Sequence, residues 1–252
     1  MLYDEGGVGV PILLLHGLMG SARTWADQVP WLRGYGHVYA VDAAGHGRAA
    51  PGVLTTEAFV ADLGELTAGI AEPMVIVGHS MGAIHGWMFA ATYPERVRAI
   101  VVEDIAPDFT GRTAAHWAEL IGSWPQPFAD EQAVLDYFGP VAGTYFLRAF
   151  TATPDGYRLH GEVDTFRAIS EEWGTRDFWS EWKSLRIPAL LIEGEHTITP
   201  PGQMRTMAEV VPDAEYVRIE GAGHLVHDEQ PQAYREHVGR FLHRVTEPTS
   251  ST

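Results

Sequence analysis

Short apolar runs alternate with longer segments of helical periodicity along most of the chain. The apolar runs, rich in Val, Ile and Leu, have the length of buried strands and lie at 11–15, 38–41, 74–77, 97–102, 187–192 and 216–219. Apolar residues spaced three or four apart predict helices over 25–32, 56–70, 81–92, 203–210 and 232–245, with Thr56 as the N-cap of the second. Because strands that alternate with helices usually pair in parallel, the pattern predicts an α/β fold, a mostly parallel central sheet flanked by helices.

Residues 107–184 depart from this alternation. They hold more than half of the chain's aromatic residues and show no strand pattern, only short helical stretches broken by Gly and Pro. Such a segment is too long for a loop and too aromatic for a disordered linker. We predict a helical cap, 107–184, inserted into a core formed by 1–106 and 185–252. Most of its aromatics are expected to hold the cap together, and a minority to line a pocket. The polar tail 246–252 is expected to fray.

Composition limits the partners and the compartment. The chain has 17 basic and 33 acidic residues, a formal charge of −16, and a single lysine, Lys183. Nucleic acids and anionic membranes bind clustered Lys and Arg, so neither is an expected partner. Cysteine is absent, which excludes disulfides and Cys-based metal sites. No apolar stretch approaches the ~20 residues that span a bilayer, and the first nine residues lack the positive charge of a signal peptide. We therefore expect a cytoplasmic protein.

The segment Gly78-His79-Ser80-Met81-Gly82 fits G-x-S-x-G and lies between a predicted strand and a predicted helix. A serine on such a tight turn has strained backbone angles, and the flanking glycines let neighbouring backbone pass close by. The turn exposes the hydroxyl above the sheet and brings the first helix amides near any developing negative charge. We predict Ser80 as a nucleophile and the Met81 amide as an oxyanion donor.

A serine hydroxyl is a weak nucleophile and needs a base within reach. His224 follows the last predicted strand, in the small-residue loop Gly221-Ala222-Gly223-His224, where the base is expected in the chain order Ser, acid, His. The other histidines are expected to have structural roles, with His79 and His85 packing beside Ser80. No histidine pair shows ligand spacing with a nearby carboxylate, so no metal site is expected.

The first predicted strand is followed by His16-Gly17-Leu18-Met19-Gly20. This glycine-containing turn is expected to present the Leu18 amide. Together with the Met81 amide it would donate to the oxyanion of a tetrahedral intermediate.

These motifs together resemble the α/β-hydrolase superfamily over nearly the whole chain. The matching segments are HGLMGS at 16–21, DAAGHGRA at 42–49, GHSMG at 78–82, YPERV at 93–97 and GAGHLVHDEQP at 221–231. The resemblance implies the α/β-hydrolase fold, with the cap inserted between the sixth and seventh strands of that fold.

The acid of the triad departs from the superfamily's usual pattern. Most members carry an aspartate after the seventh strand, in patterns like GxxDxxxP, and Thr197 stands at that position here. Asp104, in the DIAP sequence after the preceding strand, resembles the acid of a subgroup of small bacterial serine esterases. In that subgroup Thr197 would be a supporting hydrogen-bond partner. Asp104 is thus predicted to orient His224. Glu195 is the rival, and Glu103, which points the opposite way along the strand, is the third candidate.

The resemblance implies a serine hydrolase that cleaves a carboxylester or thioester of a small, largely apolar substrate through an acyl-enzyme, without a cofactor. Two alternatives stay open. The same triad can open lactones, hydrolyse carbon–carbon bonds or catalyse cofactor-free perhydrolysis. The fold can also serve a non-catalytic ligand receptor. No oligomeric state is predicted.

Overall fold

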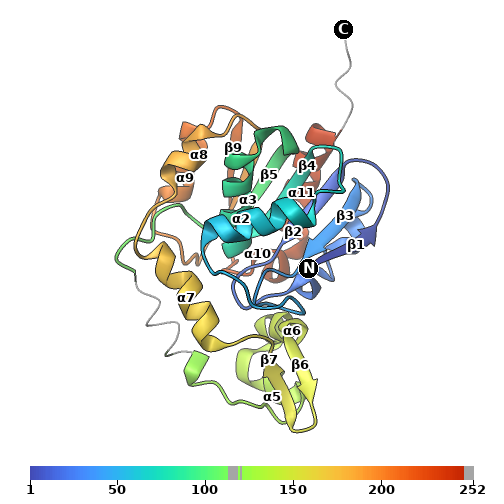
Figure 1. Ribbon diagram of the computed structural model, residues 1–252, viewed down its shortest axis with the longest axis vertical. Helices are drawn as coiled ribbons and strands as arrows, with labels where there is room; N and C mark the ends of the chain where they lie inside the picture. The colour runs from blue at the N-terminus through green and yellow to red at the C-terminus, as the bar shows by residue number, and fades with distance from the viewer. Residues whose placement is uncertain (113–118, 120, 247–252) are drawn as a thin grey trace.

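The computed structural model describes residues 1–112, 119 and 121–246, and its centre is a seven-stranded sheet in the order β1-β3-β2-β4-β5-β8-β9 (Figure 1). The strands are β1 (Leu2–Gly6), β2 (Pro11–Leu15), β3 (His37–Val41), β4 (Met74–His79), β5 (Val97–Glu103), β8 (Ala189–Gly194) and β9 (Ala214–Ile219). All neighbouring pairs are parallel except β1 and β3. The predicted fold class is therefore confirmed. The sequence analysis missed β1, because this edge strand is only half-buried and carries polar residues.

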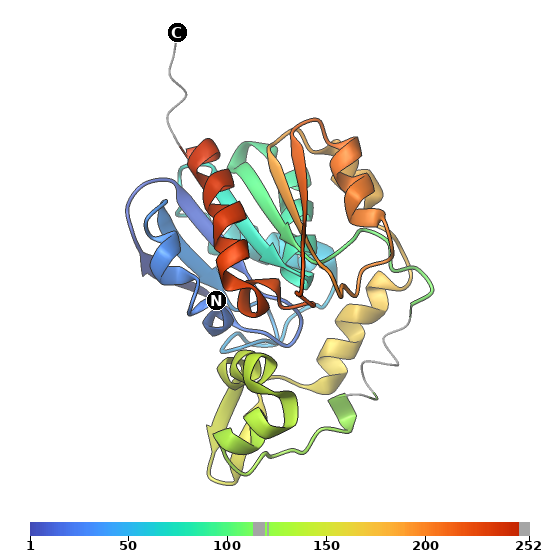
Figure 2. The same ribbon diagram turned by 180° about the vertical axis from the view of Figure 1, so that it is seen from behind.

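Helices cover both faces of the sheet. One face carries α2 (Thr56–Leu66), α3 (Met81–Thr92), α8 (Trp179–Ser184) and α9 (Gln203–Val210). The other carries α1 (Val29–Leu32) and α11 (Pro231–Thr246), which runs behind the sheet in Figure 1 and in front of it in Figure 2. A short helix, α10 (Val226–Glu229), precedes α11. In the described part of the chain no helix is long and apolar enough to cross a membrane.

Two helix predictions differ from the structure in detail. The helix expected over 25–32 is split into the 3-10 turn η1 (Ala22–Trp25) and α1, which has a proline in its first turn. Pro30 lacks the N–H that would continue a helix from the preceding turn, so a new helix starts here. The N-cap of α2 is Thr55, whose hydroxyl accepts from Ala58 N at 3.3 Å, rather than the predicted Thr56.

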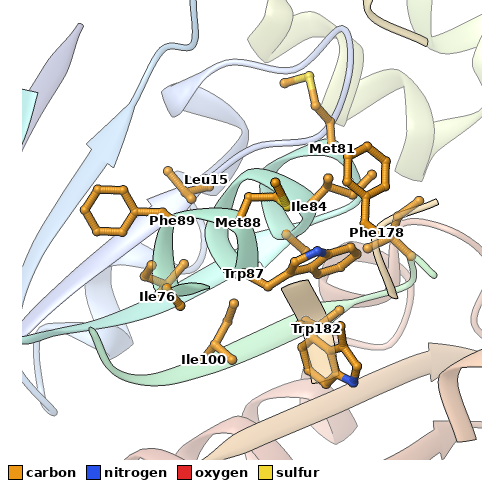
Figure 3. Close-up of a cluster of buried hydrophobic side chains, with 14 of the residues drawn as sticks. Leu15, Ile76, Met81, Ile84, Trp87, Met88, Phe89, Ile100, Phe178 and Trp182 are labelled. Carbon is orange, nitrogen blue, oxygen red and sulfur yellow. The ribbon is translucent and has the colours of Figure 1, made fainter. Parts of the chain in front are cut away.

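Helix α3 is buried on all sides, which fixes the position of the residue that precedes it, Ser80. Residues 81–90 of this helix are all buried, as expected of a central helix without a polar face. Trp87 packs edge-on against Trp182 of α8, with ring centroids 5.7 Å apart, and both side chains are fully buried (Figure 3). Truncating such a tryptophan to alanine typically costs about 3–5 kcal/mol.

Most of the segment between β5 and β8 lies beyond the sheet, below it in Figure 1, whereas its last helix, α8, lies beside α9. The segment contains α5 (Glu131–Phe138), α6 (Pro140–Ala149), β6 (Phe150–Thr153), β7 (Gly156–Leu159), α7 (Val163–Trp173) and α8. A cluster around Trp124, Phe128 and Phe150 holds its lower part together. The expectation of no strands here was wrong, because β6 and β7 form an antiparallel hairpin. Four residues per strand are too few for a period-two pattern to stand out.

The boundary predicted at residue 184 stays a prediction. Trp182 joins α8 to the core packing, so the last part of the segment lies against α3 rather than beyond the sheet. Trp117 and the tail 247–252 lie outside the described residues.

Candidate active site

Ser80 has unusual backbone angles, φ 51° and ψ −122°, at the turn between β4 and α3. Only three described non-glycine residues have a positive φ, and the other two are Met19 (65°) and Asp104 (49°). Such conformations cost of order ~1–3 kcal/mol each and persist where the surroundings over-determine them, commonly at functional sites. Met19 and Ser80 line one cavity, and Asp104 contacts a third residue of its lining, His224. The strained positions of the described chain therefore gather at the predicted site.

The glycines around Ser80 are required by close packing. A Cβ on Gly82 would lie 2.2 Å from the carbonyl oxygen of Leu15, and a Cβ on Gly78 would lie 2.6 Å from Cα of Ala83. Real side chains do not tolerate such distances, so the turn can form only with glycine at both positions. This is the steric origin of the G-x-S-x-G pattern.

Asp104 and His224 are in direct contact. Oδ2 of Asp104 lies 2.8 Å from Nδ1 of His224, and Oδ1 accepts a hydrogen bond from Gly194 N at 2.9 Å. Asp104 is fully buried, whereas the His224 side chain is 25% exposed. An ionised carboxylate can only accept, so Nδ1 carries the hydrogen and Nε2 of a neutral ring is left as an acceptor.

The other acid candidates do not contact His224. Glu195 accepts from Gly221 N at 2.8 Å, its other oxygen lies 3.9 Å from Arg218, and its side chain is 38% exposed. Glu103 is fully buried and contacts a different histidine, His227, with 2.8 Å between Oε1 and Nδ1.

Thr197, predicted as a supporting partner of the triad, makes its hydrogen bonds with Thr199. Its hydroxyl donates to Thr199 Oγ1 at 3.0 Å and accepts from Thr199 N at 2.9 Å. The second oxygen of Asp104 is bonded by the Gly194 amide instead. The supporting role of Thr197 remains a prediction.

Two residues hold the backbone of the His224 loop, and sequence reasoning assigned neither this task. Nε2 of His79 lies 2.9 Å from the His224 carbonyl oxygen. Because burial holds the pKa of His79 well below its usual value, the ring is neutral and donates through Nε2. The Glu229 carboxylate accepts from Gly223 N at 2.6 Å and Leu225 N at 3.1 Å. Glu229 belongs to the GAGHLVHDEQP motif, and this membership was the signal from which its role could have been predicted.

The Leu18 and Met81 amides are available as donors. Among the described residues neither N–H donates to another protein group, and Met81 is the first residue of α3, where helix amides have no intrahelical acceptor. The Gly17 carbonyl oxygen is bonded by His16 Nδ1 at 2.7 Å and by Gly20 N at 3.0 Å. Since a trans peptide points its C=O and N–H in opposite directions, these bonds fix the direction of the Leu18 N–H.

Ser80 and His224 line one cavity of about 470 Å³ between the sheet and the inserted segment. Its wall is mostly apolar, with Leu18 and Ile105 from the core side and Phe146 and Trp173 from the inserted segment. Volume and lining suit a small organic ligand. A second cavity of about 420 Å³, lined by His16, Asp42 and His85, contains neither Ser80 nor His224.

No metal site is evident in the described part of the chain, where no three His, Cys, Asp or Glu residues are grouped closely enough to hold an ion.

Comparison with known proteins agrees with the fold and the motifs. The model of the alpha/beta hydrolase family matches residues 12–237, so the chain belongs to this family and is a hydrolase enzyme. A Bacillus subtilis (strain 168) protein named uncharacterized carboxylesterase nap is 29% identical over an alignment of 260 residues. The alignment spans 94% of this chain and 80% of that protein.

Two solved esterase structures are also similar. A marine microorganism esterase has a TM-score of 0.77 at 27% identity, covering 96% of this chain and 98% of its own. A thermophilic esterase from Thermogutta terrifontis, solved with malate bound, has a TM-score of 0.77 at 25% identity, covering 98% and 94%. Bacterial esterases of the α/β-hydrolase superfamily are thus among the relatives of this chain.

Proposed function

We propose that this hydrolase cleaves carboxylesters or thioesters of small, largely apolar substrates through an acyl-enzyme on Ser80. The observation that carries the proposal is the 2.8 Å contact between buried Asp104 and Nδ1 of His224 at the cavity that Ser80 also lines. The carboxylesterase name of a relative and the esterase neighbours favour the same reaction class.

The first half of the reaction forms the acyl-enzyme. His224 Nε2 takes the hydroxyl proton as Ser80 Oγ attacks the substrate carbonyl, and the oxyanion accepts from the Leu18 and Met81 amides. Asp104 holds the ring in the required tautomer and stabilises the imidazolium. His224 then gives its proton to the leaving alcohol or thiol as the carbon–oxygen or carbon–sulfur bond breaks.

The second half releases the acid. A water molecule gives a proton to His224 Nε2 and attacks the acyl carbonyl, and the proton returns to Ser80 Oγ as the acyl bond breaks. The cycle consumes one water and needs no cofactor. The inserted segment, proposed as a cap over residues 107–184, supplies Phe146 and Trp173 to the cavity wall and would select the acyl or alcohol group.

Turnover of p-nitrophenyl butyrate by the wild type and by Ser80→Ala tests the proposal. We expect clear turnover by the wild type and a loss of several orders of magnitude in the variant. A thioester, a lactone and a peroxide-dependent assay run beside it separate ester hydrolysis from the other reactions of a serine triad. If the wild type turns over none of these substrates, the proposed function is wrong.

A further inference from the structure

Arg112 places a positive charge on the wall of the mostly apolar cavity that Ser80 and His224 line. Within the described part of the chain it is the only arginine or lysine on the wall of the cavity that Ser80 and His224 share. It comes from the loop after β5, on the side of the inserted segment. Arg112 is exposed, so its guanidinium is open to a ligand that enters the cavity.

Within the described part of the chain, no acidic side chain pairs with this charge. Among the described residues the Arg112 guanidinium makes no hydrogen bond and no ion pair, and the backbone N of Arg112 donates to Phe109 O at 2.9 Å. The acid of its own loop is Asp108, whose pKa is lowered by a hydrogen bond from Thr110 and, less strongly, by the charge of Arg112. Asp108 is thus an ionised neighbour that forms no direct contact with the guanidinium.

The acid in the cavity wall, Glu229, is already engaged. Its two oxygens accept from the backbone amides of Gly223 and Leu225. These two bonds hold the backbone of the His224 loop, and they also fix the position of the Glu229 carboxylate. Among the described residues, Glu229 forms no ion pair with Arg112.

The backbone that carries Arg112 is anchored at two places. Gly111 N donates to Gly174 O at 3.1 Å, beside the end of α7. The side chain of Gln203, at the start of α9, accepts from Asp108 N at 3.1 Å and donates to Asp108 O at 2.9 Å. These bonds define where the Arg112 side chain leaves the backbone at the cavity wall.

We propose that Arg112 binds a second, ionised carboxylate of the substrate, so that the enzyme acts on half-esters of aliphatic dicarboxylic acids. A guanidinium matches a carboxylate in a two-point, charge-assisted geometry. A chain with a net charge of −16 repels anions in general, and a local cation inside the screening distance of about 8 Å offsets this at the site. The inference rests on the proposed ester hydrolysis and names its substrate class.

The test compares two methyl esters with the same six-carbon acyl chain, methyl hexanoate and monomethyl adipate, which differ by the terminal carboxylate. We expect the wild type to favour monomethyl adipate in kcat/KM by about tenfold or more, the range of a hydrogen bond to a charged group. Arg112→Gln should remove this preference mainly through KM, because the remote contact binds ground and transition states alike. The quantity compared is the ratio of kcat/KM for the two esters within each protein, so a general loss of activity in the variant does not count as a loss of preference.

Arg158→Gln is the matched control. Arg158 lies on β7, outside the cavity wall, and its side chain likewise forms no hydrogen bond or ion pair with any described residue. Removing this charge should leave both esters unaffected. If the two variants change kcat/KM for monomethyl adipate equally, the effect comes from the net charge of the protein and the inference is overturned.

A measurement on the wild type alone gives an independent check. Adipate should inhibit turnover of p-nitrophenyl butyrate at a concentration about tenfold lower than hexanoate does. Inhibition by hexanoate at equal or lower concentration, with a wild-type preference for methyl hexanoate, contradicts the role of Arg112 and leaves the ester hydrolysis intact. Absence of turnover of every ester by the wild type instead contradicts the proposed function itself.

Discussion

Glu103 and Asp104 are consecutive in the chain, yet their carboxylates bind two different histidines, His224 in the loop after β9 and His227 in the short helix α10. Asp104 contacts His224 Nδ1 at 2.8 Å, and Glu103 contacts both the ring and the backbone N of His227, at 2.8 and 3.0 Å. The positive φ of Asp104, 49°, follows directly on the end of β5. The carboxyl end of one central strand therefore holds the chain after β9 at two points three residues apart.

The first prediction is that Asp104, and not Glu195, orients His224. Asp104→Asn keeps the shape of the side chain but spoils the imidazole tautomer, which costs about 10⁴ in turnover in the serine-protease precedent. Glu195→Gln should stay within about tenfold of the wild type, because Glu195 bonds only backbone and Arg218 at the surface. Turnover of p-nitrophenyl butyrate and the melting temperature of both variants provide the measurement.

A rescue experiment sharpens this test. Thr197→Asp, placed in the Asp104→Asn background, rebuilds an acid where most of the superfamily carries it and should restore part of the activity. Near-normal turnover in Asp104→Asn beside an inactive Glu195→Gln would reverse the assignment.

The buried pair of Glu103 and His227 should make stability depend on pH. Burial opposes the imidazolium, but the Glu103 carboxylate prevails and raises the pKa of His227. A raised pKa means that the pair stabilises the fold fully below the ordinary histidine pKa of about 6.5, and that this is lost as pH rises through the raised value. Glu103→Gln should cost about 3–5 kcal/mol at pH 6, because it breaks a buried pair.

The pH dependence separates this effect from a packing defect. The difference in unfolding free energy between the wild type and Glu103→Gln, from urea denaturation, should shrink between pH 6 and pH 9. A difference that stays constant over this range would show that the charge of His227 contributes nothing.

Asp42 should contribute to stability against acid. It accepts hydrogen bonds from Ala22 N at 2.7 Å, Arg48 N at 2.8 Å and Tyr3 OH at 2.8 Å. Burial opposes its ionisation, yet these bonds lower the pKa of Asp42 overall. A lowered pKa gives stability that is present above the ordinary value of about 3.9 and is lost as pH falls through the lowered one.

Asp42→Asn should therefore lose about 2–4 kcal/mol at pH 7, measured by urea denaturation, since bonds to a charged acceptor are weakened together. The difference in unfolding free energy between the wild type and Asp42→Asn should shrink as pH falls below 4. Asp4 provides the control. Its bonds to Gly6 N and His37 lie at the surface, so Asp4→Asn should lose much less stability than Asp42→Asn. Equal losses in the two variants would contradict a special role for Asp42.

The inserted segment should set the preference for acyl chain length. Phe146 lines the cavity from α6, so Phe146→Ala enlarges the site and should shift the optimum among p-nitrophenyl esters toward longer chains. Tyr137→Ala is the control, because Tyr137 is 48% exposed and lies outside the cavity wall. If a folded Phe146→Ala protein keeps the chain-length profile of the wild type, the inserted segment covers the site without selecting the acyl chain.

The sequence predicted the elements whose local pattern is strong. The buried strands, α3 and α9 follow from unbroken apolar periodicity, and the Ser80 turn follows from its glycines. Contacts between distant segments could not be predicted from the sequence. The bonds from His79 to the His224 carbonyl and from Gly194 to Asp104 join residues 145 and 90 positions apart. Backbone partners of this kind depend on tertiary structure, and a backbone amide has no side chain through which sequence could mark it.

Covalent labelling of Ser80 tests the central claim most directly. A fluorophosphonate should add one label to the wild-type chain, and peptide mapping by mass spectrometry should place it on Ser80, with Ser80→Ala unmodified under the same conditions. His224→Gln should react far more slowly, because the hydroxyl loses its base. A label on a different serine, or equal labelling of Ser80→Ala, would contradict the assignment of Ser80 as the nucleophile.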